Sequence, residues 1–165
     1  MRFSLRPDRL YARYTQITPQ LLTREGVRLV LCDLDYTLAP KSVHRPDEAV
    51  RGWLEALEAA GITVMILSNN RSTRRVETFC RDLGIRYIGH AHKPRPAAYR
   101  RAMAEANAAP AETIMLGDKL LTDMLGANLS GCRAWMVEPL GGPVGAWNHV
   151  LHLLQKPFKA LRREK

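Results

Sequence analysis

Residues 27–37 read VRLVLCDLDYT, an apolar run that ends in two aspartates and a threonine. Positions 27–34 are rich in branched apolar residues, which is typical of a buried strand. Asp33 and Asp35 are two positions apart, so in an extended segment their side chains start on the same face. This stretch therefore predicts a buried strand that delivers two carboxylates near its carboxyl end.

The rest of the chain alternates short apolar runs with longer stretches of helical periodicity. Further strands are predicted at 62–67, 85–88, 113–116 and 132–137. Helices are predicted at 46–60, 73–83, 97–107 and about 120–129, and a last helical segment begins near 146. Strands joined by helix-length crossovers predict an α/β fold. We expect a Rossmann-like three-layer sandwich with a central parallel sheet, in one domain over residues 1–165.

Polar residues that could take part in catalysis or ligand binding follow the predicted strands. Ser68 and Asn69 come after the second strand, Lys93 comes shortly after the third, and Asp118 and Asp123 follow the fourth. Ligands bind outside the carboxyl ends of the strands in such sheets. We therefore expect these side chains to converge with Asp33 and Asp35 at one edge of the sheet.

Three or more carboxylates at one point repel each other unless a cation joins them. No histidine or cysteine cluster accompanies them, and an all-oxygen ligand set suits Mg²⁺. A lysine and a serine beside such a site suit a bound phosphoryl group. An ionised Asp33 can attack phosphorus, and a protonated Asp35 can give its proton to the leaving oxygen and then take one from water. The nearby negative charge is expected to raise the proton affinity of Asp35, so the two would titrate as a coupled pair.

This arrangement resembles the haloacid dehalogenase (HAD) superfamily of phosphatases. The resemblance rests on DxDxT at 33–37, Ser68 after the next strand, Lys93, and GDxxxxD at 117–123. It implies a phosphoaspartate intermediate, with Asp33 as nucleophile and Asp35 as general acid and base.

The same resemblance implies the roles of the remaining residues. Mg²⁺ would be held by the Asp33 carboxylate, the Asp35 backbone carbonyl and Asp118, with Asp123 in support. The phosphoryl group would be held by Thr37, Ser68, Asn69 and Lys93.

Many HAD phosphatases carry a cap domain, and this sequence leaves no room for one. One helix fits between Thr37 and Ser68, and one fits between Asn70 and Lys93. An open site can accept a phosphate presented by a large partner such as a lipid, a protein or a polynucleotide. Residues 10–160 resemble the capless IIIA-type subfamily called YqeG-like, on the cues of residues 17–22, 92–94 and 117–128. That resemblance implies kinship with phosphatidylglycerophosphate phosphatases, which produce phosphatidylglycerol.

The formal net charge of +9 over 165 residues favours acidic partners. Residues 146–165, the C-terminal segment, combine apolar residues at helical spacing with a basic cluster. Such a helix can lie at an anionic lipid surface, and the alternative is that its apolar stripe packs on the domain. With no signal-peptide pattern at the N-terminus, we expect a cytoplasmic protein with peripheral contact at the inner face of the membrane.

Two other functions stay open. One is a HAD phosphatase of a soluble ester, such as a sugar phosphate, histidinol phosphate or a nucleic-acid end. The other is a basic protein associated with RNA or ribosomes, which the lack of aromatics interleaved on a basic strand disfavours. The sequence leaves the oligomeric state open.

Several further residues invite a functional interpretation. His90 and His92 lack a third nitrogen or sulfur ligand, so a metal role is disfavoured for them. Arg71 and Arg95 could contact the substrate or remain solvated charges. Cys32, Cys80 and Cys132 are odd in number without paired spacing, which indicates reduced, buried thiols.

Overall fold

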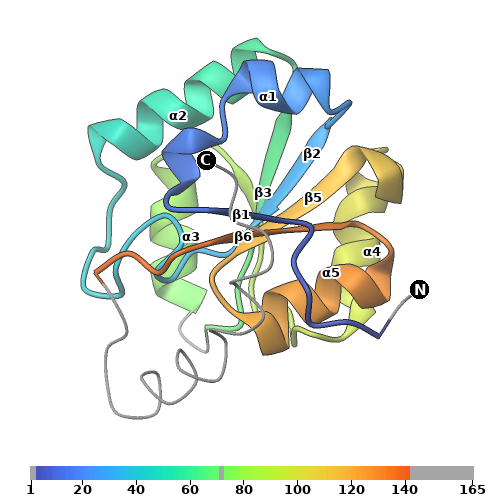
Figure 1. The fold of residues 1–165 in the computed structure, drawn as a ribbon. Helices are drawn as coiled ribbons and strands as arrows, with labels where there is room; N and C mark the ends of the chain where they lie inside the picture. The colour runs from blue at the N-terminus through green and yellow to red at the C-terminus, as the bar shows by residue number, and fades with distance from the viewer. Residues whose placement is uncertain (1–2, 71–72, 142–165) are drawn as a thin grey trace.

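A single sheet of six parallel strands forms the centre of the molecule (Figure 1). The computed structural model describes residues 3–70 and 73–141, so the C-terminal segment lies outside the described residues. In sheet order the strands are β1 (Arg9–Tyr11), β6 (Arg133–Val137), β5 (Thr113–Gly117), β2 (Leu29–Cys32), β3 (Thr63–Leu67) and β4 (Arg86–Ile88).

Helices cover both faces of the sheet, as the α/β pattern predicts. On one face lie α1 (Pro19–Arg24), α2 (Glu48–Ala59) and α3 (Thr73–Arg81), and on the other lie α4 (Pro96–Glu105) and α5 (Leu125–Ser130) (Figure 1). Successive strand residues face opposite layers, so Val30 packs in the cluster of Trp53 while Leu31 packs in the cluster of Tyr99. The predicted three-layer sandwich is confirmed.

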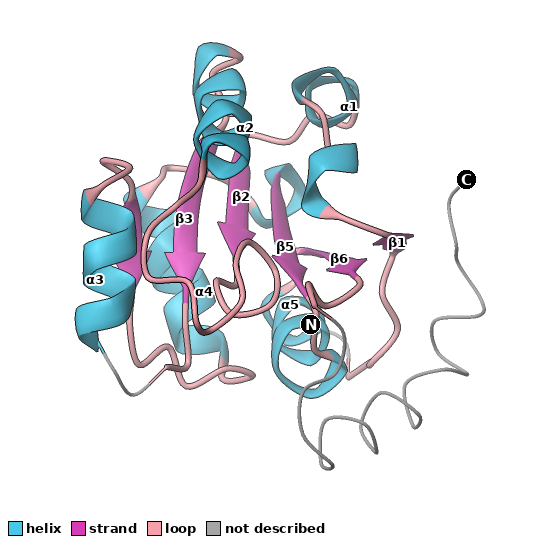
Figure 2. Cartoon of the chain, turned by 90° about the vertical axis from the view of Figure 1, so that its left-hand side faces the viewer, coloured by secondary structure: helices cyan, strands magenta, loops and turns pink. Residues whose placement is uncertain are grey.

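The strand order changes direction at β2, although all the strands are parallel. From β2 it moves outward to β3 and β4, and it then returns to β5 on the other side of β2. Cys32 is in register with Ile66 of β3 and with Leu116 of β5, so the three strands end at one level (Figure 2). A reversal of this kind opens a crevice at the carboxyl ends of the strands.

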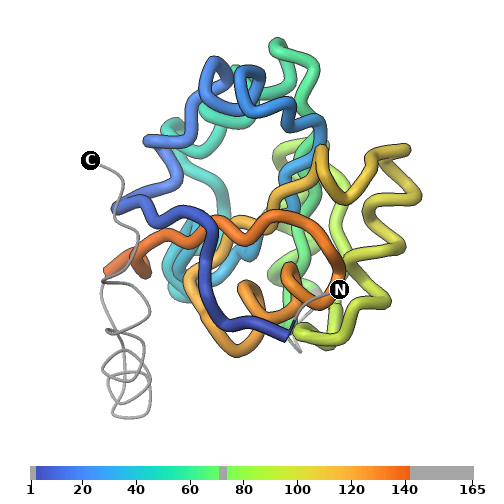
Figure 3. The backbone as a smooth tube through the Cα atoms, turned by 45° about the vertical axis from the view of Figure 1, so that its right-hand side comes forward, coloured from blue at the N-terminus to red at the C-terminus, as the bar shows by residue number. Residues whose placement is uncertain are grey.

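The N-terminal segment contains three short elements that the sequence patterns did not predict: β1, a 3₁₀ turn at Tyr14–Gln16, and α1. β1 pairs with β6, and α1 is capped by Thr18, whose side chain accepts a hydrogen bond from the Leu21 backbone N–H. Figure 3 shows this segment running beside β6 and α5. The Asn128 amide of α5 donates to the backbone carbonyl of Ser4 at 2.9 Å, which fixes the segment to the domain.

The predicted elements within residues 3–70 and 73–141 are present, with ends that differ by one to a few residues. The predicted helix at 120–129 begins as a π-helical turn, Leu120–Met124, before α5 continues to Ser130. Within the described residues, one helix lies between Thr37 and Ser68 and one lies between Asn70 and Lys93. The described part of the chain therefore contains no inserted cap.

Cys32, Cys80 and Cys132 are free and buried, as predicted. Burial raises the pKa of the Cys80 thiol to about 12. These thiols are part of the packed interior.

None of the helices among the described residues is long and apolar enough to cross a membrane.

Candidate active site

A cleft of about 370 Å³ opens at the carboxyl ends of the strands. Four of the predicted site residues line it: Asp33, Asp35, Asn69 and Lys93. Four more come from positions that the sequence did not single out: Lys41, Asn70, Lys119 and Thr122. The topology therefore gathers side chains from β2, β3, β4 and β5 in one place.

Three carboxylates meet at the base of this site. One ligand oxygen from each of Asp33, Asp118 and Asp123 lies within 4.8 Å of the others, and all three residues are buried. Gly117 makes this approach feasible, because a Cβ atom there would overlap the Asp123 carboxylate. Hard oxygen donors at this spacing fit a divalent cation such as Mg²⁺ or Mn²⁺.

Lys93 is the buried counter-ion of two of these carboxylates. Its Nζ lies 2.9 Å from Asp33 Oδ1 and 2.7 Å from Asp123 Oδ1, and its side chain is 2 % exposed. Burial alone would lower the pKa of Lys93, but the charges of Asp123 and Asp33 outweigh it and raise that pKa. The Asn69 side chain holds the Lys93 backbone, donating to its carbonyl at 2.9 Å and accepting from its N–H at 2.8 Å. Asn69 thus positions the lysine as well as lining the cleft.

Lys119 brings a second ammonium group to the carboxylates. Its Nζ donates to Asp118 Oδ1 at 2.6 Å, to Asp33 Oδ2 at 3.2 Å and to the Asp35 backbone carbonyl at 3.4 Å. These are the three groups that the family resemblance assigns to the metal. An ammonium held by all three shows that the oxygens point to a common place suited to a cation.

The local environments of Asp33 and Asp118 shift the pKa values of these two carboxyl groups in opposite directions. Burial opposes ionisation of Asp33, but Lys93 and Lys119 outweigh it and lower the pKa of Asp33 from 3.8 to about 2. Burial raises the pKa of Asp118 to about 7, and the charges of Asp33 and Asp123 add to that rise. Asp33 is therefore ionised at neutral pH, as a nucleophile must be.

Asp35 has partners of a different kind. The Arg75 guanidinium lies 2.7 Å from Asp35 Oδ1, and the Asn70 amide donates to Asp35 Oδ2 at 3.1 Å. Arg75 also donates to three backbone carbonyls of the 40–43 loop, at 2.8 to 3.1 Å. One buried arginine thus ties Asp35 to the loop that follows it. Arg75 lies on α3 among other arginines, and nothing in the sequence distinguishes it from them.

Not every predicted residue contacts the cleft. Thr37 and Ser68 are buried and do not line it, and Ser68 Oγ accepts the Asn70 backbone N–H at 3.0 Å. His90, His92 and Arg95 line a neighbouring pocket of about 320 Å³ instead. Arg71 lies outside the described residues.

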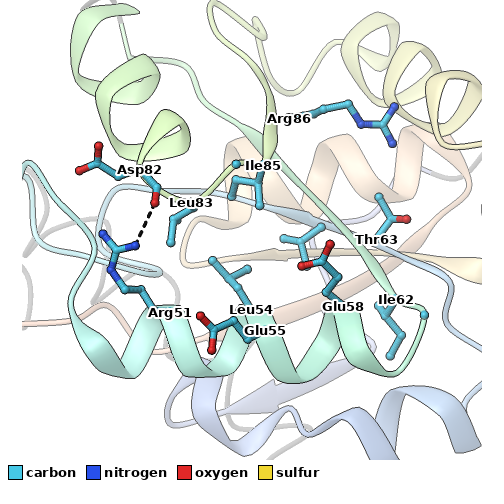
Figure 4. A pocket seen from close by; sticks show the side chains of 13 residues that line it. Arg51, Leu54, Glu55, Glu58, Ile62, Thr63, Asp82, Leu83, Ile85 and Arg86 are labelled. Carbon is cyan, nitrogen blue, oxygen red and sulfur yellow. Dashed lines mark hydrogen bonds between the residues drawn. The ribbon is translucent and has the colours of Figure 1, made fainter.

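The molecule has a larger hollow, of about 570 Å³, away from the cleft (Figure 4). Thr63 and Arg86, the first residues of β3 and β4, line it, so it lies at the opposite edge of the sheet. Arg51 donates to the Asp82 backbone carbonyl at 2.9 Å across its mouth (Figure 4). Its side chains include no cluster resembling the one at the cleft.

Residues 8–131 match the family model described as haloacid dehalogenase-like hydrolase. The chain belongs to this family. The Bacillus subtilis (strain 168) protein named "Probable phosphatase YqeG" is 36 % identical over 141 residues, which cover 84 % of this chain and 80 % of that protein. The expected HAD membership and YqeG-like resemblance are thereby confirmed.

Solved structures support the same fold. The cobalt-bound deoxy-D-mannose-octulosonate 8-phosphate phosphatase (YrbI) of Haemophilus influenzae matches with a TM-score of 0.54 and 18 % identity, covering 82 % of this chain and 91 % of that one. CbbY of Rhodobacter sphaeroides, in complex with phosphate, matches with a TM-score of 0.56 and 15 % identity, covering 72 % and 89 %. These likenesses show the fold, while the family and the 36 % identical Bacillus subtilis protein indicate that this chain is a phosphatase.

Proposed function

We propose that this chain is a Mg²⁺-dependent phosphomonoester hydrolase that works through a phosphoaspartate on Asp33. The observation that carries the proposal is the buried cluster of Asp33, Asp118 and Asp123, in which Lys93 bridges Asp33 and Asp123. The lowered pKa of Asp33 supports its role as nucleophile. Asp33, Asp118 and the Asp35 carbonyl would hold the metal, which when bound would offset their charge and polarise a phosphoryl oxygen.

The proposed chemistry has two displacements at phosphorus. Asp33 attacks phosphorus, the bond to the ester oxygen breaks, and Asp35 gives its proton to that oxygen. Water then attacks phosphorus, Asp35 takes the proton from it, and the bond to Asp33 breaks to release inorganic phosphate. For the first step Asp35 must carry a proton and separate from Arg75, which faces its carboxylate at 2.7 Å. Lys93 remains beside Asp33 throughout and is placed to contact phosphoryl oxygens.

For the substrate we propose the phosphate of an anionic phospholipid, with phosphatidylglycerophosphate as the specific case. The cleft is open, and the described residues include no cap over it. Val43 and Leu121 are 37 % and 51 % exposed, and each lies within two positions of a lysine that lines the cleft. Apolar side chains beside cationic ones suit the headgroup region of an anionic membrane. The basic, amphipathic composition of the C-terminal segment supports the same partner.

A soluble sugar phosphate is the second candidate. The observation in its favour is the structural likeness to the Haemophilus influenzae enzyme, whose described substrate is a sugar phosphate. An open cleft of about 370 Å³ could admit such a molecule directly.

A substrate panel tests both the chemistry and the choice of substrate. Phosphate release is measured with and without Mg²⁺ from phosphatidylglycerophosphate in mixed micelles, from sugar phosphates and from a chromogenic aryl phosphate. We expect the lipid to have the highest kcat/KM, and Asp33→Asn to lower it by at least about a thousandfold. Full activity in Asp33→Asn would refute the mechanism, and a preference for sugar phosphates would refute the lipid assignment alone.

A further inference from the structure

The ammonium of Lys119 stands where the family resemblance would put the metal. Its three partners are Asp118 Oδ1, Asp33 Oδ2 and the Asp35 carbonyl, at 2.6, 3.2 and 3.4 Å. Metal–oxygen distances for Mg²⁺ are shorter, about 2.1 Å, so the same three oxygens cannot surround both cations. The two cations therefore exclude each other.

The two lysines of the site differ in how firmly they are held. Lys93 is 2 % exposed in its side chain, and its backbone is fixed by Asn69. Lys119 is 39 % exposed in its side chain and lines the open cleft. Its Nζ also lies 5.9 Å from the centre of the Tyr36 ring. Lys119 can therefore leave the carboxylates without unfolding anything around it, whereas Lys93 cannot.

We propose that Lys119 is a tethered competitor of the divalent cation: its ammonium holds the three oxygens in the metal-free enzyme and is displaced when the metal binds. This inference rests on the proposed metal dependence. Once displaced, the ammonium remains in the cleft beside Lys93, where the phosphoryl group of the substrate is expected. The same side chain thus lowers the apparent affinity for metal and supplies a positive charge to the substrate afterwards.

Metal binding without substrate tests the competition directly. Mn²⁺, which is paramagnetic, serves as the probe in electron paramagnetic resonance titrations of the full chain at constant pH and ionic strength. We expect Lys119→Met to bind Mn²⁺ more tightly by on the order of tenfold, the size of one charge-assisted hydrogen bond at a partly exposed site. Lys41→Met is the matched control, because Lys41 also lines the cleft and its Nζ also lies over the Tyr36 ring, 5.8 Å from the ring centre. The Mn²⁺ affinity of Lys41→Met should differ from that of the wild type by less than about twofold, as expected when a screened charge is removed.

A second measurement separates displacement from a remote effect of charge. Lysine acetylation of the wild-type chain is followed by mass spectrometry with and without Mn²⁺. Displacement predicts that the metal speeds labelling of Lys119 several-fold while Lys93 stays protected.

The outcomes distinguish the two proposals. Equal Mn²⁺ affinity in the wild type and Lys119→Met, or labelling of Lys119 that metal does not increase, overturns the competition and leaves the metal-dependent phosphatase intact. If neither protein binds Mn²⁺, both proposals fail. If Lys119→Met does not fold, Lys119→Gln and the wild-type labelling decide the question.

Discussion

Replacing Lys93 with methionine removes the buried positive charge on which the carboxylate cluster depends. Methionine is close to lysine in length, so the substitution deletes the ammonium and leaves little change in packing. Two ion pairs disappear, at 2.9 Å to Asp33 and 2.7 Å to Asp123, from a side chain that is 2 % exposed. At this burial, solvent screening provides little relief.

The expected cost follows from the state of the partners that remain. Breaking a buried ion pair by deleting one partner costs about 3–5 kcal/mol, because the other charge stays buried without compensation. For a chain of this size each kcal/mol shifts the melting temperature by about 2–4 °C, so Lys93→Met should melt about 6–20 °C below the wild type. Activity should be lost as well, since Lys93 faces the nucleophile.

Thermal melts in EDTA and in excess Mg²⁺ measure this effect and its cause. In the variant, Mg²⁺ should raise the melting temperature more than it does in the wild type, because a divalent cation can substitute for the missing charge. Lys41→Met is the control, as Lys41 is exposed and its loss should change stability by less than about 1 kcal/mol. A melting temperature of Lys93→Met within about 2 °C of the wild type would refute the reasoning, since the loss of the counter-ion from a buried charge cluster should lower the free energy of unfolding by more than that.

Two further substitutions and one labelling experiment have definite expected results. Arg75→Met should slow hydrolysis of an alkyl phosphate more than that of a nitrophenyl phosphate, since Arg75 orients the proposed proton donor and an activated leaving group needs no proton; equal slowing would contradict this. Gly117→Ala should weaken Mn²⁺ binding at least about tenfold in a titration, because its methyl group would displace the Asp123 carboxylate, and unchanged binding would contradict the site. Cys80, with its pKa raised to about 12, should have only about one thiolate in ten thousand at pH 8, so iodoacetamide should label it in urea and leave it unlabelled in the native chain.

The sequence predicts most of the sheet because burial leaves a clear pattern in β2, β3 and β5. Each of these strands is covered on both faces, so nearly every residue in it is apolar. β1 is only three residues long, Arg9–Tyr11, and its strand character depends on pairing with β6. No local pattern of three residues can predict a partner more than a hundred positions away.

The site residues likewise fall into those that a local sequence pattern can predict and those that it cannot. Asp33, Lys93 and Asp123 could be predicted because each follows a strand at the edge where the topology places ligands. Lys119 and Arg75 could not, because their importance depends on the direction of a long side chain. The sequence shows only that Lys119 follows Asp118, and a lysine next to an aspartate is ordinarily a solvated charge.

The net charge of the site shows how a divalent metal and Lys119 can both contribute to binding of a negatively charged substrate. When Asp118, whose pKa is raised to about 7, is ionised, the carboxylates of Asp33, Asp118 and Asp123 contribute three negative charges and the ammonium groups of Lys93 and Lys119 contribute two positive ones, which leaves a net charge of minus one. A phosphomonoester dianion is repelled by that balance. A bound divalent cation would change the balance to plus one, and the proposed displacement would move the Lys119 ammonium toward the cleft, so metal binding would favour attraction of the substrate. Since the described residues include no cap, we expect this change of sign to favour binding of the metal first and of the phosphate second.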